Sequence, residues 1–313
     1  MWYDNYMILK IPLSPIVKAM AKGDQKYLKN HKTFGTFSVK KDLAYIDDGD
    51  EYHFLDIIQP VLGHDNGITL FYIHGGAYLY GTKDISRIFT SWYANQGFTV
   101  IAINYRLTSV ENHIGIKEQI SDVFAALKFI EDNKHEFDVK MDKFCLMGDS
   151  AGGHFSLLTD IIYHSTEAQE YFDIKELPNI DIKCLALNST MYDFEALLPM
   201  ARKYLTKRNC KKVLSEHCFD NEYMKKNSPR YYVKNGVKLH SLFNSTAYHD
   251  MFIDQSLLLK NDGKKYGLDL EFLLETSPRK EIGHVYNHFV FEDEGLKCNE
   301  AMVKFFKHHC DVE

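Results

Sequence analysis

The sequence lacks the features that would place a protein in a membrane or on nucleic acid. No apolar run approaches the roughly 20 residues that a membrane-spanning helix needs. The formal net charge is −6 and the sequence pI is about 6.2. The chain therefore has no excess of positive charge that would attract it to nucleic acid or to an anionic membrane. We expect neither nucleic acid nor stable membrane insertion among its interactions.

Cysteine is sparse and forms no C-x-x-C pair. Cys210, His217 and Cys218 fall close together, but no fourth ligand lies at zinc-site spacing, so we expect no metal there. Scattered cysteines in a chain of 313 residues are more typical of reduced thiols than of a disulfide framework. The N-terminus carries Asp4 where a secretory signal would have a basic region. Together these features predict a cytoplasmic protein. The six cysteines are Cys145, Cys184, Cys210, Cys218, Cys298 and Cys310.

The chain has no internal repeat and no low-complexity tract; it alternates short apolar runs with helical patterns. Such alternation is typical of βαβ units and predicts an α/β fold with a mostly parallel sheet flanked by helices. We expect strands at residues 67–76, 98–107, 143–148, 181–189, 238–246 and 268–275. We expect helices at residues 116–137, 153–165, 254–267 and 299–310.

Two segments do not fit this alternation. Residues 1–40 form one, and a helical, charged, Tyr-rich stretch at about 191–233 forms the other. Helical insertions on an open α/β sheet commonly lie over the carboxyl ends of the strands, where ligands bind. We therefore predict an N-terminal cap segment at 1–40 and a catalytic domain at 41–313 that carries a helical cap insertion at about 191–233.

The stretch Gly148–Gly152 fits G-x-S-x-G, with an apolar strand before it and a helix after it. A turn this tight forces its central residue into unfavourable backbone angles, and only glycine avoids a clash two residues to either side. Ser150 would then project outward at the start of a helix. The alternative is a Gly-rich turn in which Ser150 merely caps the helix. The partners of Ser150 must decide between the two.

An upstream loop supplies the first partner. "HGGAYLYG", residues 74–81, follows a strand and brings glycines to a place where backbone N–H groups can approach a substrate carbonyl. Together with the N–H of Ala151, these groups would stabilise an oxyanion, where one donor contributes about 3 kcal/mol. A Gly-Gly turn without function is the alternative, and the presence of both motifs in this order disfavours it.

An acid and a base follow downstream. Asp250 and Asp254 come just after the fifth predicted strand, and Asp250 is the first of them and our choice. His284 and His288 follow the sixth strand, and Gly283 makes His284 the more loop-like choice of base, with His288 as runner-up. The order Ser, Asp, His is the one expected for α/β-hydrolases.

These motifs together resemble a known family. "HGGAYLYG", "NYRL", "GDSAGG", "HDMFID" and "GHVYN" resemble, in that order, the hormone-sensitive-lipase-like branch of the α/β-hydrolases, specifically bacterial members of the acetyl-esterase and carboxylesterase type. The resemblance implies an α/β-hydrolase fold with a helical cap. It implies Ser150 as nucleophile, Asp250 as acid and His284 as base. The oxyanion donors that it implies are the N–H groups of Gly75, Gly76, Ala77 and Ala151.

The chain departs from the family's usual pattern at four places. Ala77 stands where the loop usually has a third glycine, which still leaves an N–H at that position. Asp250 is followed by Met251 and Phe252 where the family usually has Pro and Leu, and "TSVEN" replaces Ala-Pro-Glu after "YRL". The family's base motif often reads His-Gly-Phe, whereas "HVYN" stands at His284. His288, which is followed by Phe289, is therefore the runner-up base.

The expected activity is hydrolysis of small, short-chain carboxylic esters through an acyl-enzyme, with no metal or organic cofactor. The expected partner is a small-molecule ester, and a homodimer is left open. Two alternatives remain. The same triad would cleave an activated amide, as in aryl-formamidases of this fold, or the chain is a non-catalytic ligand-binding protein on a hydrolase scaffold.

Overall fold

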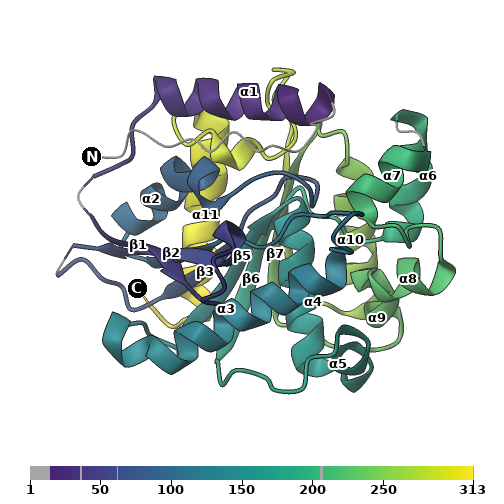
Figure 1. Ribbon diagram of the computed structural model, residues 1–313. Helices are drawn as coiled ribbons and strands as arrows, with labels where there is room; N and C mark the ends of the chain where they lie inside the picture. The colour runs from purple at the N-terminus through teal and green to yellow at the C-terminus, as the bar shows by residue number, and fades with distance from the viewer. Residues whose placement is uncertain (1–14, 36, 62, 205–206, 313) are drawn as a thin grey trace. The chain divides into compact units, whose positions relative to one another are not determined.

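The computed structural model describes residues 15–35, 37–61, 63–204 and 207–312 (Figure 1). The chain divides into two compact units, Met1–Lys32 and Thr33–Glu313. Helix α1 (Pro15–Asn30) is the described element of the first unit. Residues 1–14 of the predicted cap segment lie outside the described residues, and the cap role of residues 1–40 stays a prediction.

The second unit is built on an eight-stranded sheet of order β1-β2-β4-β3-β5-β6-β7-β8. Strand β2 runs antiparallel to β1 and β4, and the strands from β4 to β8 are parallel to their neighbours. The mostly parallel sheet is confirmed, and each of the six predicted strands overlaps an observed one. The strands are β1 (Phe37–Ala44), β2 (Phe54–Pro60), β3 (Thr69–Ile73), β4 (Thr99–Ile103), β5 (Phe144–Asp149), β6 (Ile182–Asn188), β7 (Ser241–Ala247) and β8 (Leu270–Glu275).

The two strands that were not predicted from the sequence, β1 and β2, lie at one end of the strand order of the sheet. β1 begins at Phe37, inside the range predicted as cap, and its residues are mostly exposed or half-buried. Its centre carries Lys40, Lys41 and Asp42, and charged side chains of this kind protect an edge strand from pairing with other chains. By contrast, every residue of β3, β4 and β5 is buried, because parallel strands are covered on both faces.

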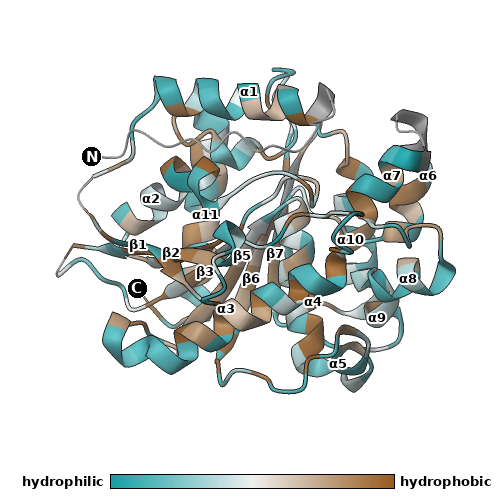
Figure 2. Ribbon diagram, in the orientation of Figure 1, coloured by the Kyte–Doolittle hydropathy of each residue, from teal (hydrophilic) through white to brown (hydrophobic). Residues whose placement is uncertain are grey.

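Helices cover both faces of this sheet. Figure 1 shows α3 and α4 together on one side and α2 and α11 on the other, and Figure 2 shows hydrophobic residues concentrated in the central strands. The predicted helix at 116–137 is confirmed as α3, and α10 ends at Gly267 with φ 70°. The helices are α2 (Arg87–Asn95), α3 (Ile116–Phe137), α4 (Ala151–His164), α5 (Thr166–Phe172), α10 (Ile253–Tyr266) and α11 (Asp293–His309), with 3₁₀ turns at Glu51–His53, Lys83–Ser86 and Tyr286–His288.

The chain between β6 and β7 is helical, as its sequence pattern predicts. It contains α6 (Phe194–Tyr204), α7 (Lys207–Leu214), α8 (Asn221–Lys226) and α9 (Pro229–Lys234). Arg230 of α9 joins this segment to α10, since its guanidinium lies 2.6 Å from Asp262 and 3.0 Å from Asp193. That these helices cap a ligand site stays a prediction. All six cysteines are buried and none forms a disulfide with a described residue. No described helix is long and apolar enough to cross a bilayer.

A buried cation holds the antiparallel edge to the rest of the sheet. The Lys83 side chain is 1% exposed, and its Nζ lies 2.6 Å from Asp42 Oδ1 and 2.9 Å from Asp56 Oδ1. Burial acts to lower the pKa of Lys83, but the charges of Asp56 and Asp84 raise it above its ordinary value. The ammonium group therefore neutralises the buried Asp56 carboxylate and links it to the exposed Asp42.

Lys83→Met should destabilise the protein by about 3 kcal/mol or more, because it leaves the buried Asp56 carboxylate without its cation. Urea unfolding followed by circular dichroism measures the change. Lys128→Met is the matched control, since Lys128 pairs with Asp132 on the exposed face of α3 and its loss should hardly move the midpoint. Equal midpoints for the two variants would contradict the account.

Candidate active site

Ser150 lies in the turn between β5 and α4, with φ 51° and ψ −114°. This left-handed backbone is unusual for a residue with a side chain and marks a position that the surrounding structure enforces. The Ser150 N–H donates to the Asn188 carbonyl at 2.8 Å, so the turn stays attached to the neighbouring strand β6. The strand–turn–helix context that the motif requires is present.

The glycines around Ser150 are required by close backbone contacts. A Cβ on Gly152 would lie 1.9 Å from the Ile73 carbonyl oxygen at the end of β3. A Cβ on Gly148 would lie 2.4 Å from the backbone of Gly152, and one on Gly153 would lie 2.7 Å from the Thr190 hydroxyl. A side chain at Gly148 or Gly152 would push β5, β3 and α4 apart, and one at Gly153 would displace the Thr190 side chain.

The structure brings His284 and Asp250 to Ser150 in one line of hydrogen bonds. His284 Nε2 lies 2.9 Å from Ser150 Oγ, and His284 Nδ1 lies 2.8 Å from Asp250 Oδ1. Ser150 follows β5, Asp250 follows β7 and His284 follows β8, so all three stand at the carboxyl ends of parallel strands. The His284 side chain is 24% exposed, which leaves the imidazole open to a reactant.

Asp250 is buried and held as a carboxylate. Its Oδ2 accepts a hydrogen bond from the Thr246 hydroxyl at 2.9 Å, and its Oδ1 accepts the Phe252 N–H at 2.8 Å. Burial acts to raise the pKa of Asp250, but the hydrogen bond and charge of His284 bring it below its ordinary value. Asp254 is instead exposed in the first turn of α10, away from this line of hydrogen bonds.

Two further residues position the acid and the base, and the sequence analysis missed them. Ser189, which directly follows β6 with φ 51°, accepts the N–H of Val285 at 3.1 Å, and its side chain also acts to lower the pKa of Asp250. Thr246 donates to Asp250 from the end of β7. The sequence does show that both residues lie at strand ends, near the predicted acid. Serine and threonine are too common at strand ends for this position to single them out.

One of the four predicted oxyanion donors, Gly75 in the loop after β3, is already engaged, which corrects the prediction. The Gly75 N–H donates to Asp149 Oδ2 at 3.1 Å, so it is not available as an oxyanion donor. The N–H groups of Gly76, Ala77 and Ala151 form no hydrogen bond with the described residues. Ala151 opens α4, where the first N–H groups of a helix lack intrahelical partners.

Ala77, the departure from the usual glycine, adopts φ 53°. An L-residue in this region is strained by roughly 1–2 kcal/mol, so the fold imposes the conformation on it. Two donors fix the carbonyl of the next residue, Tyr78: the Thr108 N–H and the Gln119 side-chain amide, each at 2.8 Å. The backbone directly after Ala77 is therefore held from two sides.

His288, the runner-up base, contacts Asp149 rather than Ser150. Its Nε2 lies 3.2 Å from Asp149 Oδ1 and 3.3 Å from the Tyr72 hydroxyl, and its ring stacks on Phe89 at 4.3 Å between centroids. Burial acts to raise the pKa of Asp149, but the charge of His288 brings it below its ordinary value. His288 is thus a hydrogen-bond partner of Asp149, the carboxylate that also accepts the Gly75 N–H.

A cavity of about 680 Å³ lies elsewhere, beside the starts of α3 and α8. Gly115, Glu118, Tyr171 and Tyr223 are among its lining residues, and Ser150, Asp250 and His284 are not. Among the described residues, the side chains grouped at metal-ligand spacing are Asp160, His164 and His240, which also lie outside the candidate active site.

Comparison with known proteins identifies a family and a fold. The model of the BD-FAE family, an α/β-hydrolase family, matches residues 55–262, which is more than half of the chain and includes Ser150 and Asp250. Esterase B of Lactobacillus rhamnosis superposes with a TM-score of 0.84 at 23% identity, over 95% of this chain and 96% of that chain. Another structure of this enzyme, inhibited by a tributyrin phosphonate, gives the same TM-score and identity over 95% and 94% of the two chains.

More distant structures have the same fold. A bacterial heroin esterase superposes with a TM-score of 0.68 at 16% identity, over 94% of this chain and 90% of that chain. At these identities the likeness establishes the fold alone. The expected α/β-hydrolase architecture, a mostly parallel sheet flanked by helices, is confirmed.

Curated relatives match over shorter segments. Arylacetamide deacetylase of Bos taurus is 36% identical over 92 residues, which cover 28% of this chain and 22% of that protein. A putative alpha/beta hydrolase of Acanthamoeba polyphaga mimivirus is 23% identical over 143 residues, which cover 45% of this chain and 40% of that protein. The chain thus spans less than half the length of the curated relatives it matches.

Gly152→Ala should cost about 3 kcal/mol of unfolding free energy, because its Cβ would meet the Ile73 carbonyl inside van der Waals distance. Thermal and urea unfolding measure the loss. Gly23→Ala in α1 is the control for a helical glycine, since its Cβ would meet nothing within 4 Å. A Gly152→Ala protein as stable as this control would refute the close approach of β3 and α4.

Proposed function

Because this chain belongs to the BD-FAE family of α/β-hydrolases, we propose that it is a serine esterase with Ser150 as nucleophile, His284 as base and Asp250 as acid. The observation that carries the proposal is the continuous line of hydrogen bonds from Ser150 Oγ through the His284 imidazole to Asp250. Each distance lies within hydrogen-bond reach, and the order of groups is the one that activates a serine hydroxyl.

The reaction proceeds in two halves. His284 Nε2 removes the proton from Ser150 Oγ as the oxygen attacks the ester carbonyl carbon, and the same proton then passes to the leaving alcohol. The acyl group remains on Ser150. A water molecule, deprotonated by His284, attacks this acyl-enzyme and releases the carboxylic acid. Asp250 keeps the imidazole in the tautomer that leaves Nε2 free to accept, and stabilises the imidazolium.

The negative charge of the tetrahedral intermediate requires donors that are not already engaged. The N–H groups of Gly76, Ala77 and Ala151 meet this condition among the described residues, and Gly75 does not. The start of α4 adds the positive end of a helix dipole at the same place. Each donor is expected to stabilise the transition state by about 3 kcal/mol.

Small esters are the favoured substrates. Esterase B, the structure reported with a tributyrin phosphonate, shares the fold over nearly the whole of both chains, and its inhibitor carries butyryl-length groups. This likeness supports a short-chain carboxylic ester as the substrate class here. The chemistry itself uses only side chains and backbone groups of the chain.

Amide hydrolysis is a second candidate, and one observation favours it. Arylacetamide deacetylase of Bos taurus, whose name denotes cleavage of an aryl amide, is 36% identical over the 92 matched residues. The same groups would act on both bonds, but an amide needs stronger protonation of the leaving nitrogen. Turnover of 4-nitrophenyl acetate, 4-nitroacetanilide and an N-formyl aryl amide separates the two: faster amide than ester turnover would replace the ester proposal.

Ser150→Ala should lower kcat/KM for 4-nitrophenyl butyrate by at least about 10⁴-fold, because the nucleophile is removed while the rest of the site remains. A fluorophosphonate probe should label the unmodified protein at Ser150 and leave the variant unlabelled. Activity that survives in the variant would overturn the assignment. A protein that neither labels nor turns over esters would instead be a binding protein on a hydrolase scaffold.

His284→Gln and His288→Gln form a matched pair that tests which histidine is the base. His284→Gln should lower kcat by about 10⁴-fold or more, since glutamine cannot accept the serine proton at neutral pH. His288→Gln keeps a hydrogen-bond donor toward Asp149 and should change kcat by less than about tenfold. Steady-state kinetics on one ester would decide, and the reverse ranking would make His288 the base.

A further inference from the structure

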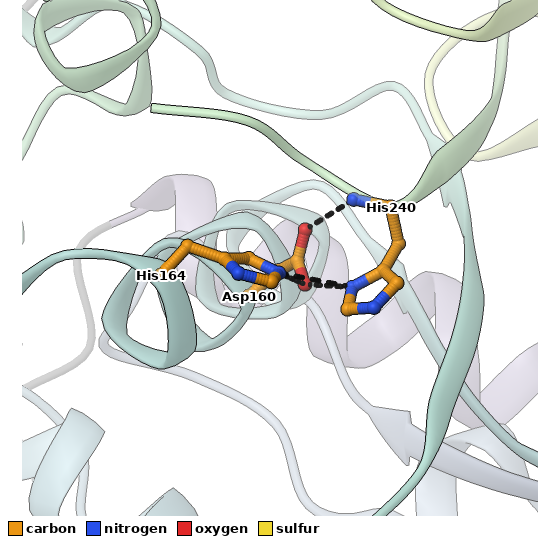
Figure 3. Close-up of side chains that lie close together, drawn as sticks. All are labelled: Asp160, His164 and His240. Carbon is orange, nitrogen blue, oxygen red and sulfur yellow. Dashed lines mark hydrogen bonds and ion pairs between the residues drawn. The ribbon is translucent and has the colours of Figure 1, made fainter. Parts of the chain in front are cut away.

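Three ligand-type side chains meet at the end of the sheet opposite the candidate active site. Asp160 and His164 lie one turn apart near the carboxyl end of α4, and His240 immediately precedes β7 (Figure 3). Ser150 precedes α4, a helix of 14 residues and about 20 Å, so the cluster is remote from the hydrolytic chemistry. Among the described residues it is the group whose ligand atoms all lie within 4.8 Å of one another.

The spacing of the three atoms suits a tetrahedral ion. Ligands bound at about 2.0–2.1 Å around a tetrahedral zinc lie about 3.3 Å from one another. His164 Nε2 lies 3.3 Å from His240 Nδ1 and 3.5 Å from Asp160 Oδ1. His240 Nδ1 and Asp160 Oδ1 are 2.6 Å apart, a hydrogen-bond distance that must open by under 1 Å when an ion replaces the shared proton.

The carboxylate is already oriented by the backbone. Asp160 Oδ2 accepts the N–H of His240 at 3.0 Å, which leaves Oδ1 facing the two imidazoles (Figure 3). A hydrogen bond of this kind to a ligating carboxylate fixes its direction, as ligands of metal sites commonly require. The carboxylate is fully buried, whereas the side chains of His164 and His240 are 36% and 31% exposed.

The charges of the cluster also suit a cation. The Asp160 carboxylate is buried and lies within 3.5 Å of a ring nitrogen of both His164 and His240. A buried anion beside two half-exposed imidazoles attracts positive charge from the solvent side. Two nitrogen ligands and one oxygen favour zinc and its transition-metal neighbours over magnesium or calcium, which take oxygen ligands.

We propose that Asp160 Oδ1, His164 Nε2 and His240 Nδ1 bind one zinc-type divalent ion that fastens α4 to the start of β7. Water completes the coordination from the exposed side. The ion ties together two elements that also present Ser150 and Asp250 at their other ends. It stabilises the fold and takes no part in ester cleavage, so the proposal is independent of the function proposed above.

Zinc titration of tag-free protein against a chromophoric chelator tests the site. The unmodified protein should bind one equivalent, and His164→Ala and His240→Ala should each weaken this binding by on the order of 100-fold. His113→Ala is the matched control, because it removes another imidazole that pairs with a carboxylate, Glu216 at 3.0 Å, on the exposed surface. The control should bind zinc like the unmodified protein.

Two further readouts keep the test independent of how well any variant folds. Cobalt added to the unmodified protein should give the visible absorption bands of a tetrahedral ion, and zinc should raise its Tm but not that of His164→Ala. His164 lies half-exposed at the end of α4, so its truncation leaves the Asp160–His240 contact intact. Absence of saturable zinc binding, or equal binding by His164→Ala, would overturn the proposed metal site. The three side chains would then only hydrogen-bond α4 to the start of β7.

Discussion

The close approach of β3, β5 and α4 at Gly148 and Gly152 is the constraint on which the candidate active site depends. It forces Ser150 into a left-handed backbone and places the first turn of α4 against the end of β3. Asp149, the residue before Ser150, adds two hydrogen bonds beside this contact. One of its carboxylate oxygens accepts the Gly75 N–H, and the other accepts the Tyr72 hydroxyl at 2.5 Å. The turn and the N–H loop are therefore fixed relative to each other before any substrate arrives.

Several residues near this contact have a side chain and a strained, positive φ. Among the described residues with a side chain and a positive φ, Ala77, Tyr78, Ser150, Ser189 and Val285 all lie in the turn, the N–H loop or the segments that hold the acid and base. Such conformations persist only where the surrounding structure over-determines them. Here the buried parallel strands enforce these conformations. The Ser150 hydroxyl, the His284 imidazole and the Asp250 carboxylate are thereby held together at the carboxyl ends of the strands.

The parts of this arrangement that the sequence predicted are those encoded locally. Six strands, the long helix α3 and the Ser150 turn follow from periodicity and glycine spacing over a few residues. Positions after the predicted strands nominated Asp250 and, with Gly283, His284, and the catalytic roles of these two residues stay proposals. Predictions failed where pairing across the fold decides. β1 carries Lys40, Lys41 and Asp42 at its centre, which interrupt its alternation, and it pairs antiparallel with β2 outside any βαβ unit. The engagement of Gly75 depends on a hydrogen bond between residues 74 positions apart. The contact of His288 with Asp149, which no local pattern reveals, joins residues 139 positions apart. The Asp160–His240 cluster joins residues 80 positions apart and carries no local signal.

The central claim is that Ser150 becomes acylated during turnover. The most direct measurement is acid quenching of the protein within a few turnovers of 4-nitrophenyl butyrate, followed by peptide mapping in a mass spectrometer. The account predicts a butyryl group on the peptide that contains Ser150, formed with a burst of nitrophenol that matches the amount of protein. Ester turnover with no adduct, or an adduct on another residue, would contradict it.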